Sequence, residues 1–88
     1  MSDHTLSERD LRQVLVVRFA VDGSSLTLDQ PLFSSGTLDS FHLLDLIAHL
    51  ESTTGIRISP GEVSLDNLDS MARILAFVDR KQHPSPNP

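Results

Sequence analysis

The chain has 88 residues, enough for one small domain, and 39% of them are hydrophobic, which can supply a single compact core. Because it contains no cysteine, disulfides, thiolate metal sites and cysteine nucleophiles are excluded. The net charge is −5 and the seven basic residues are thinly spread, so neither nucleic acid nor an anionic membrane is expected as a partner. The longest apolar run, residues 14–17, is too short to span a membrane, and the first residues show no signal pattern, so we expect a cytoplasmic protein.

The first expected element is a helix over residues 8–21, preceded by a flexible N-terminus over residues 1–6. Ser7 and Asp10 fit an N-terminal cap, and the acidic residues favour the positive end of the helix dipole. Apolar side chains then recur on one face of this helix: Leu11, Val14, Leu15 and Phe19.

A long connection follows, rich in Gly, Ser and Pro, which excludes a continuous helix or a central strand over residues 22–38. Apolar residues are nevertheless spaced along it, as expected of a loop anchored in the core: Leu26, Leu28, Leu32, Phe33 and Leu38. We therefore predict an ordered, packed loop.

The second helix is predicted to begin at Asp39 or Ser40 and to end at Thr53 or Thr54, before Gly55. Its apolar residues cover more than one face, and those predicted to point inward are Leu43, Leu46, Ile47 and Leu50. The neighbouring face, made by Phe41, Leu44 and Ala48, is either left for a partner or buried by the rest of the bundle.

Two further helices are expected. Ser59, Pro60 and Glu62 form the start of a short one, and the last helix begins near Ser70 with a regular apolar stripe. Three prolines within residues 84–88 cannot continue a helix, so residues 83–88 are predicted to form a disordered tail. The predicted fold is therefore all-α, a small bundle of three main helices and one short helix, with its domain over residues 7–82.

Catalytic patterns are scarce. His42, Asp45 and His49 lie at i, i+3 and i+7 of the second helix, where they could form a metal site, but two turns separate the histidines and no further ligand is near. No phosphate-binding loop or nucleophile elbow occurs, so an enzyme is not expected.

The distinctive feature is Ser40 at the start of an apolar helix. One interpretation is that Ser40 or Asp39 only caps this helix. The other is that Asp39 is the cap, which leaves the Ser40 hydroxyl free, because Leu43 rather than Glu or Gln lies three residues further on. A phosphate attached there would be favoured by the free N–H groups and the dipole of the helix N-terminus.

The run from Leu32 to Phe41, with the following Leu-Leu-Asp-Leu-Ile-Ala-His-Leu-Glu and Gly55 to Ile58, resembles the acyl carrier protein family. The resemblance covers residues 11–81, including Asp66 to Ser70. It implies that Ser40 accepts 4′-phosphopantetheine from coenzyme A, with Asp39 as its usual neighbour, and that the arm carries an acyl or aminoacyl group as a thioester. This would make the chain a carrier domain without catalysis of its own.

By the same resemblance, the partners are a phosphopantetheinyl transferase and enzymes that load or remove the cargo. They would dock on the second helix through three apolar and two acidic residues, and the carrier is expected to be a monomer. The docking residues implied are Phe41, Leu44, Asp45, Ala48 and Glu51.

The chain departs from the fatty-acid type, because His42 and His49 occupy outward positions and leave few acids on that helix. The stretch around Ser40 also resembles aminoacyl and D-alanyl carriers, and the sequence does not separate these types. The alternative from another class is a cofactor-free helical adaptor that binds a protein through the same apolar face.

Overall fold

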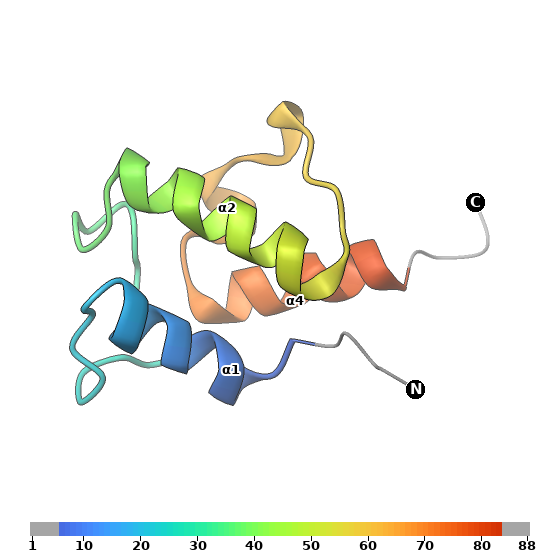
Figure 1. Cartoon of the computed structure of the whole chain (residues 1–88). Coiled ribbons are helices and arrows are strands. Elements are labelled where there is room, and N and C mark those ends of the chain that lie inside the picture. Colours follow the sequence, from blue (N-terminus) through green and yellow to red (C-terminus); the bar gives the residue numbers. More distant parts are fainter. Residues whose placement is uncertain (1–5, 84–88) are drawn as a thin grey trace.

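Three main helices, α1 (Glu8–Gln13), α2 (Ser40–Thr54) and α4 (Met71–Gln82), form the body of the computed structural model, which describes residues 6–83. Figure 1 shows α2 and α4 running in about the same direction and α1 running the opposite way. A short helix, α3 (Leu65–Leu68), packs on α4, and α4 also contacts α1 and α2. The described residues contain no strand, which confirms the all-α prediction.

The core is built where these helices meet. Leu46 and Leu50 of α2 are completely buried, as predicted, whereas Leu43 and Ile47 are only half-buried at its sides. The other fully enclosed side chains come from the first helix, the long loop, α3 and α4: Leu11, Leu15, Leu32, Leu68, Met71, Ile74 and Val78. No helix in the described part of the chain is long and apolar enough to cross a membrane.

The first helix differs from the prediction. After α1 it continues as a π-helical segment, η1 (Val14–Arg18), and then ends three residues before Val21. The valines of this segment are β-branched, so their χ1 angles are restricted and their side chains crowd a regular α-helix. The hydrophobic pattern alone did not reveal that the helix would become π-helical here. Ala20 then adopts the left-handed conformation, with φ of 59°, and turns the chain into the loop.

The long loop between Arg18 and Ser40 is ordered, as predicted, and three of its leucines are buried: Leu26, Leu32 and Leu38. Leu28 was also expected in the core, but it is 39% exposed. The loop is anchored at this point by its backbone instead, because the Leu28 carbonyl accepts a hydrogen bond of 2.9 Å from Ala72 N–H at the start of α4.

The short helix predicted to start with Ser59, Pro60 and Glu62 is a 3-10 helix, η2 (Pro60–Glu62), closed by the capping box between Ser59 and Glu62. The separate helix α3 that follows was not predicted, because four residues are too few to show a helical period.

Both predicted flexible ends fall mainly on residues 1–5 and 84–88, which lie outside the described residues. Leu6, however, is buried in the core, so the packed region begins one residue earlier than predicted. Burial of the apolar Leu6 side chain stabilises the fold, and the prediction of a flexible terminus over residues 1–6 did not take this into account.

Candidate functional site

The N-terminus of α2 is closed by Asp39. Its side-chain oxygen accepts hydrogen bonds from the N–H groups of Phe41, at 3.0 Å, and His42, at 3.1 Å. In return the His42 ring nitrogen Nδ1 lies 3.3 Å from the Asp39 N–H and accepts from it, which completes a capping box with histidine in the third position. Asp39 is therefore the cap, and Ser40 is the first helical residue.

The same contacts keep the Asp39 carboxylate ionised. The hydrogen bond from the His42 backbone N–H lowers the pKa of Asp39 below its ordinary value, and this effect outweighs partial desolvation, which acts in the opposite direction. Near neutral pH the cap is therefore a carboxylate that only accepts hydrogen bonds.

Ser40 is exposed, and its hydroxyl forms no hydrogen bond with any described residue. It lies at the edge of a cleft of about 390 Å³. The cleft is enclosed by the end of the long loop, the start of α2 and the segment leading into α3, and its lining is mostly apolar: Phe33, Leu38, Asp39, Ser40, Leu43, Val63, Ser64, Leu65 and Leu68.

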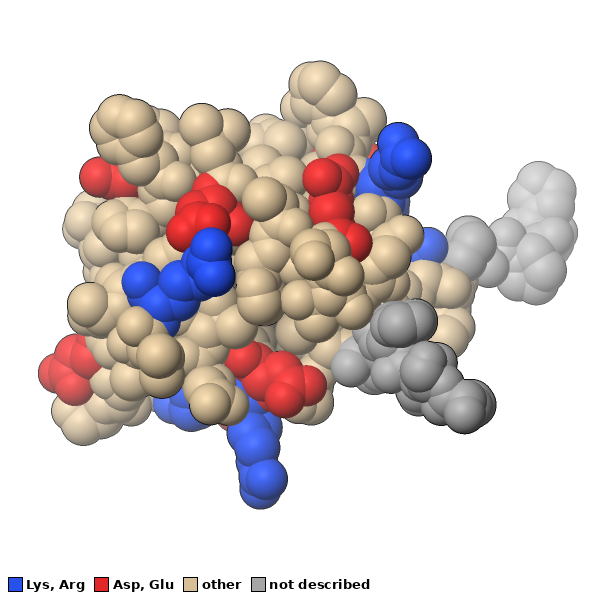
Figure 2. All heavy atoms as spheres, in the orientation of Figure 1, with Lys and Arg blue, Asp and Glu red and all other residues tan. Residues whose placement is uncertain are grey.

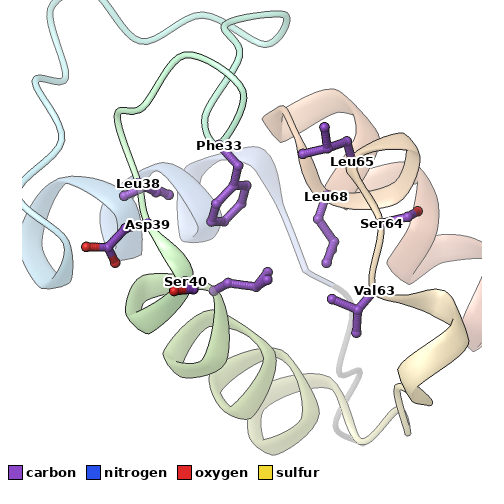
Figure 3. A pocket seen from close by; sticks show the side chains of 9 residues that line it. Phe33, Leu38, Asp39, Ser40, Val63, Ser64, Leu65 and Leu68 are labelled. Atoms are coloured by element: carbon purple, nitrogen blue, oxygen red, sulfur yellow. The ribbon is translucent and has the colours of Figure 1, made fainter.

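The cleft lies between two walls, one formed by the end of the long loop and the start of α2, the other by α3 and the segment before it. Figure 3 shows Phe33, Val63 and Leu68 pointing into the space between the two helices, whereas the Asp39 carboxylate points away from it. Val63, Leu65 and Leu68 were not among the predicted site residues, because they are separated from Ser40 by more than twenty positions and share no motif with it.

The three apolar residues predicted to bind partners lie on the surface of α2. Phe41 is 80% exposed and Leu44 67% exposed, and Ala48 is also exposed. The alternative interpretation of the sequence, in which the rest of the bundle buries this second face, is therefore wrong.

The two acidic residues predicted beside them already have partners within the chain. Asp45 accepts two hydrogen bonds from Arg18, at 3.0 and 2.9 Å, and these lower the pKa of Asp45. Glu51 accepts a hydrogen bond of 2.8 Å from the backbone N–H of Ile58. Figure 2 shows that several acidic side chains on this side of the molecule lie next to a basic one, and that most of the visible surface carries neither charge.

The candidate metal ligands His42, Asp45 and His49 do not converge. Asp45 is bound to Arg18, and the His42 ring lies against Asp39 and, edge to face, against Phe19. No group of three His, Asp or Glu side chains within residues 6–83 could hold a metal ion.

Ser40 therefore presents an exposed hydroxyl at the first helical position of α2, beside an apolar cleft in a small helical domain. The model of the family described as "Phosphopantetheine attachment site" matches residues 9–75, and the chain belongs to this family. It is a carrier protein that bears a covalently attached 4′-phosphopantetheine group.

The chain is also similar to D-alanyl carrier proteins of Streptococcus pyogenes, among them those of serotype M5 (strain Manfredo), serotype M49 (strain NZ131) and serotype M1. To each it is 33% identical over 66 residues, which cover 75% of this chain and 84% of the relative.

The residues at the start of α2 fit such a group. A phosphodiester carries one negative charge, which the dipole of a helix N-terminus favours. The N–H groups of Phe41 and His42 are not free for it, because both donate to Asp39. Ser40 offers an exposed hydroxyl at this point, and the cleft beside it is wide and apolar enough to contact the uncharged part of an arm.

Proposed function

We propose that Ser40 is the residue to which the 4′-phosphopantetheine group is attached. The observation that carries this proposal is the division of roles between two neighbours. Asp39 caps α2 by accepting from the N–H groups of both Phe41 and His42, so the Ser40 hydroxyl is not needed as a cap. It is exposed and remains accessible to coenzyme A on the transferase.

The attachment is a phosphoryl transfer from coenzyme A. The Ser40 oxygen forms a bond to the β-phosphorus, its proton passes to a base of the transferase, and adenosine 3′,5′-bisphosphate leaves with the electrons of the broken anhydride bond. The N-terminus of α2 then faces the new phosphodiester, whose charge it favours. When attached, the arm supplies a terminal thiol that holds the cargo as a thioester.

The cargo that we propose is an aminoacyl or short acyl group. The similarity to D-alanyl carrier proteins supports an aminoacyl cargo, since their name states what they carry. Within residues 6–83 no group of His, Asp or Glu side chains could hold a metal ion. We propose that the chain is not an enzyme and that partner enzymes catalyse each step.

These partners are proposed to be a phosphopantetheinyl transferase and the enzymes that load and remove the cargo. They would dock on the exposed surface of α2 made by Phe41, Leu44 and Ala48, with Asp45 and Glu51 at its edges. An interface of this kind is small and releases its partner quickly, as a carrier that visits several enzymes requires. We propose a monomer in the cytoplasm, where coenzyme A is available.

Intact-mass measurement tests the attachment. The chain is incubated with coenzyme A and a broad-specificity phosphopantetheinyl transferase, and we expect the mass of one arm to be added. Ser40→Ala should abolish the addition, whereas Ser52→Ala, which removes another exposed hydroxyl of the same helix, should not. No addition to the unaltered chain with several transferases would contradict the proposal and leave the cofactor-free adaptor, which the family match does not favour.

A further inference from the structure

Asp69 lies between α3 and α4, far from Ser40 in the sequence, and both oxygens of its carboxylate accept hydrogen bonds from the long loop. Oδ1 accepts hydrogen bonds from three consecutive backbone N–H groups, those of Leu32 at 3.2 Å, Phe33 at 2.7 Å and Ser34 at 2.9 Å. Oδ2 accepts a hydrogen bond of 2.6 Å from the Ser34 hydroxyl. The single N–H of Leu32 is shared between Oδ1 and the Asp69 backbone carbonyl, which lies closer to it, at 2.6 Å.

This contact determines how the chain enters α2. Leu32 is completely buried, and its carbonyl accepts a hydrogen bond of 2.8 Å from Leu38 N–H, which closes the loop on itself. Leu38 is buried in turn and is followed directly by the cap residue Asp39 and by Ser40. An unbroken series of hydrogen bonds and buried side chains therefore leads from Asp69 to the attachment serine.

The same contact holds together the two walls of the cleft beside Ser40. Phe33, whose N–H binds Asp69, belongs to the loop wall, and Leu68, which directly precedes Asp69, belongs to the α3 wall. A change at this carboxylate would therefore alter both the position of the serine and the width of the cleft.

The electrostatic state of Asp69 agrees with this geometry. Burial on its own raises the pKa of the carboxyl, but the Ser34 hydroxyl and the three backbone N–H groups more than offset it and lower the pKa below its ordinary value. Asp69 is therefore an ionised acceptor at neutral pH, in which state its hydrogen bonds are strongest.

We propose that Asp69 is a positioning residue for arm attachment, which fixes the loop that presents Ser40 and the cleft beside it. This inference rests on the proposed attachment at Ser40. It goes beyond that proposal in assigning a role in the reaction to a residue that touches neither the serine nor the arm.

Kinetics separate positioning from stability. If Asp69→Ala only unfolded part of the sample, the concentration of folded carrier would be lower than the total concentration. The apparent KM for the carrier would then rise, and kcat would be unchanged. If the serine is misplaced in a folded carrier, kcat falls while the docking surface on α2 and the KM remain. We expect a roughly tenfold lower kcat, since small displacements of a reacting group are costly.

Two further variants sharpen the test. Asp69→Asn keeps an oxygen for the backbone N–H groups and can donate to the Ser34 hydroxyl, so it should restore kcat to within about threefold of the unaltered chain. Ser34→Ala removes only the hydrogen bond of 2.6 Å between the Ser34 hydroxyl and Asp69, so its effect on kcat should be smaller than that of Asp69→Ala. If Asp69→Ala folds poorly, Ser34→Ala still tests the inference. Glu62→Ala is the control, because the Glu62 carboxylate also accepts hydrogen bonds from a backbone N–H, that of Ser59, and from Lys81, and its side chain does not line the cleft although Val63 next to it does.

The experiment measures arm addition by intact mass at several carrier concentrations, together with hydrogen exchange of the Phe33 and Ser34 amides. Faster exchange and lower kcat in Asp69→Ala, both restored in Asp69→Asn and absent in Glu62→Ala, support the inference. An unchanged kcat in both Asp69→Ala and Ser34→Ala, an equal loss in Glu62→Ala, or no restoration by Asn overturns it. Failure of the unaltered chain to accept the arm instead overturns the proposed function, and this inference with it.

Discussion

The guanidinium of Arg18 donates two hydrogen bonds, of 3.0 and 2.9 Å, to the carboxylate of Asp45. The pair connects the end of η1 to the middle of α2, beside the apolar surface proposed to bind partners. About half of each side chain remains exposed, so water and salt reach both charges.

Arg18→Gln should therefore lower the free energy of unfolding only slightly, and this loss should disappear in about 1 M salt, where charges are screened within a few ångströms. Urea unfolding of the single variant, of Asp45→Asn and of the double variant at low and high salt measures the coupling between the two residues. A large coupling that persists at high salt would contradict an exposed, screened pair.

Leu46 and Phe41 lie on opposite sides of α2, and truncating them should have very different effects. Leu46 is completely buried, so Leu46→Ala removes core contacts and should cost roughly 2–5 kcal/mol. Phe41 is 80% exposed, and Phe41→Ala should lose little stability but slow the transfer of the arm by a partner enzyme. Chemical unfolding of both variants tests this expectation, and equally large losses would mean that Phe41 is part of the core.

The bounds of α2, its cap and its exposed face could be predicted from the sequence because their signals are local. Asp39 and Gly55 mark the two ends of α2, and the spacing of Phe41, Leu44 and Ala48 separates them from the buried leucines. The local pattern left open whether Ser40 only caps the helix; its assignment as the attachment site came from the family resemblance of residues 32–41, and it stays a prediction.

The contacts that the sequence did not reveal join distant segments. Asp69 binds residues more than thirty positions away, and Arg18 reaches Asp45 across 27 positions, so no spacing rule connects them. Glu51 was assigned to partner binding by the family resemblance, which did not reveal that its carboxylate accepts a hydrogen bond from Ile58 N–H of the following segment. Where several polar side chains could make a given contact, only the tertiary arrangement decides which one does.

Asp39 and Ser40 are predicted to differ in their effect on stability. Asp39→Ala removes the acceptor for Phe41 and His42 N–H and should lower the free energy of unfolding, whereas Asp39→Asn, another good capping residue, should retain most of it. Ser40→Ala should leave stability unchanged, because no described residue bonds to its hydroxyl. Thermal melts of the three variants test these roles, and a marked loss in Ser40→Ala would show that the serine is itself a cap.

Acid should destabilise the fold partly through Asp69. Its folded pKa lies below its ordinary value of 3.8, so the unfolded chain binds the proton more readily than the folded chain. The stabilising contribution is therefore complete above the unfolded pKa and is lost as the pH falls through the folded pKa. Urea midpoints measured between neutral pH and about pH 3 should fall less steeply in Asp69→Asn than in the unaltered chain. Parallel curves would indicate that Asp69 has the same proton affinity in both states.

Gly55 and Ala20 both adopt the left-handed backbone conformation, with φ of 79° and 59°. This conformation costs a residue with a Cβ atom about 1 kcal/mol more than glycine, so Gly55→Ala should destabilise the fold by about that amount. Ala20→Gly should have the opposite sign, reduced by the greater freedom of glycine in the unfolded chain. Gly61→Ala is the control, because Gly61 has no positive φ and no atom lies within 4 Å of the added methyl group. Urea unfolding of the three variants gives the signs directly, and a destabilising Ala20→Gly would show that the turn after η1 is held by side-chain packing of Ala20 rather than strained by it.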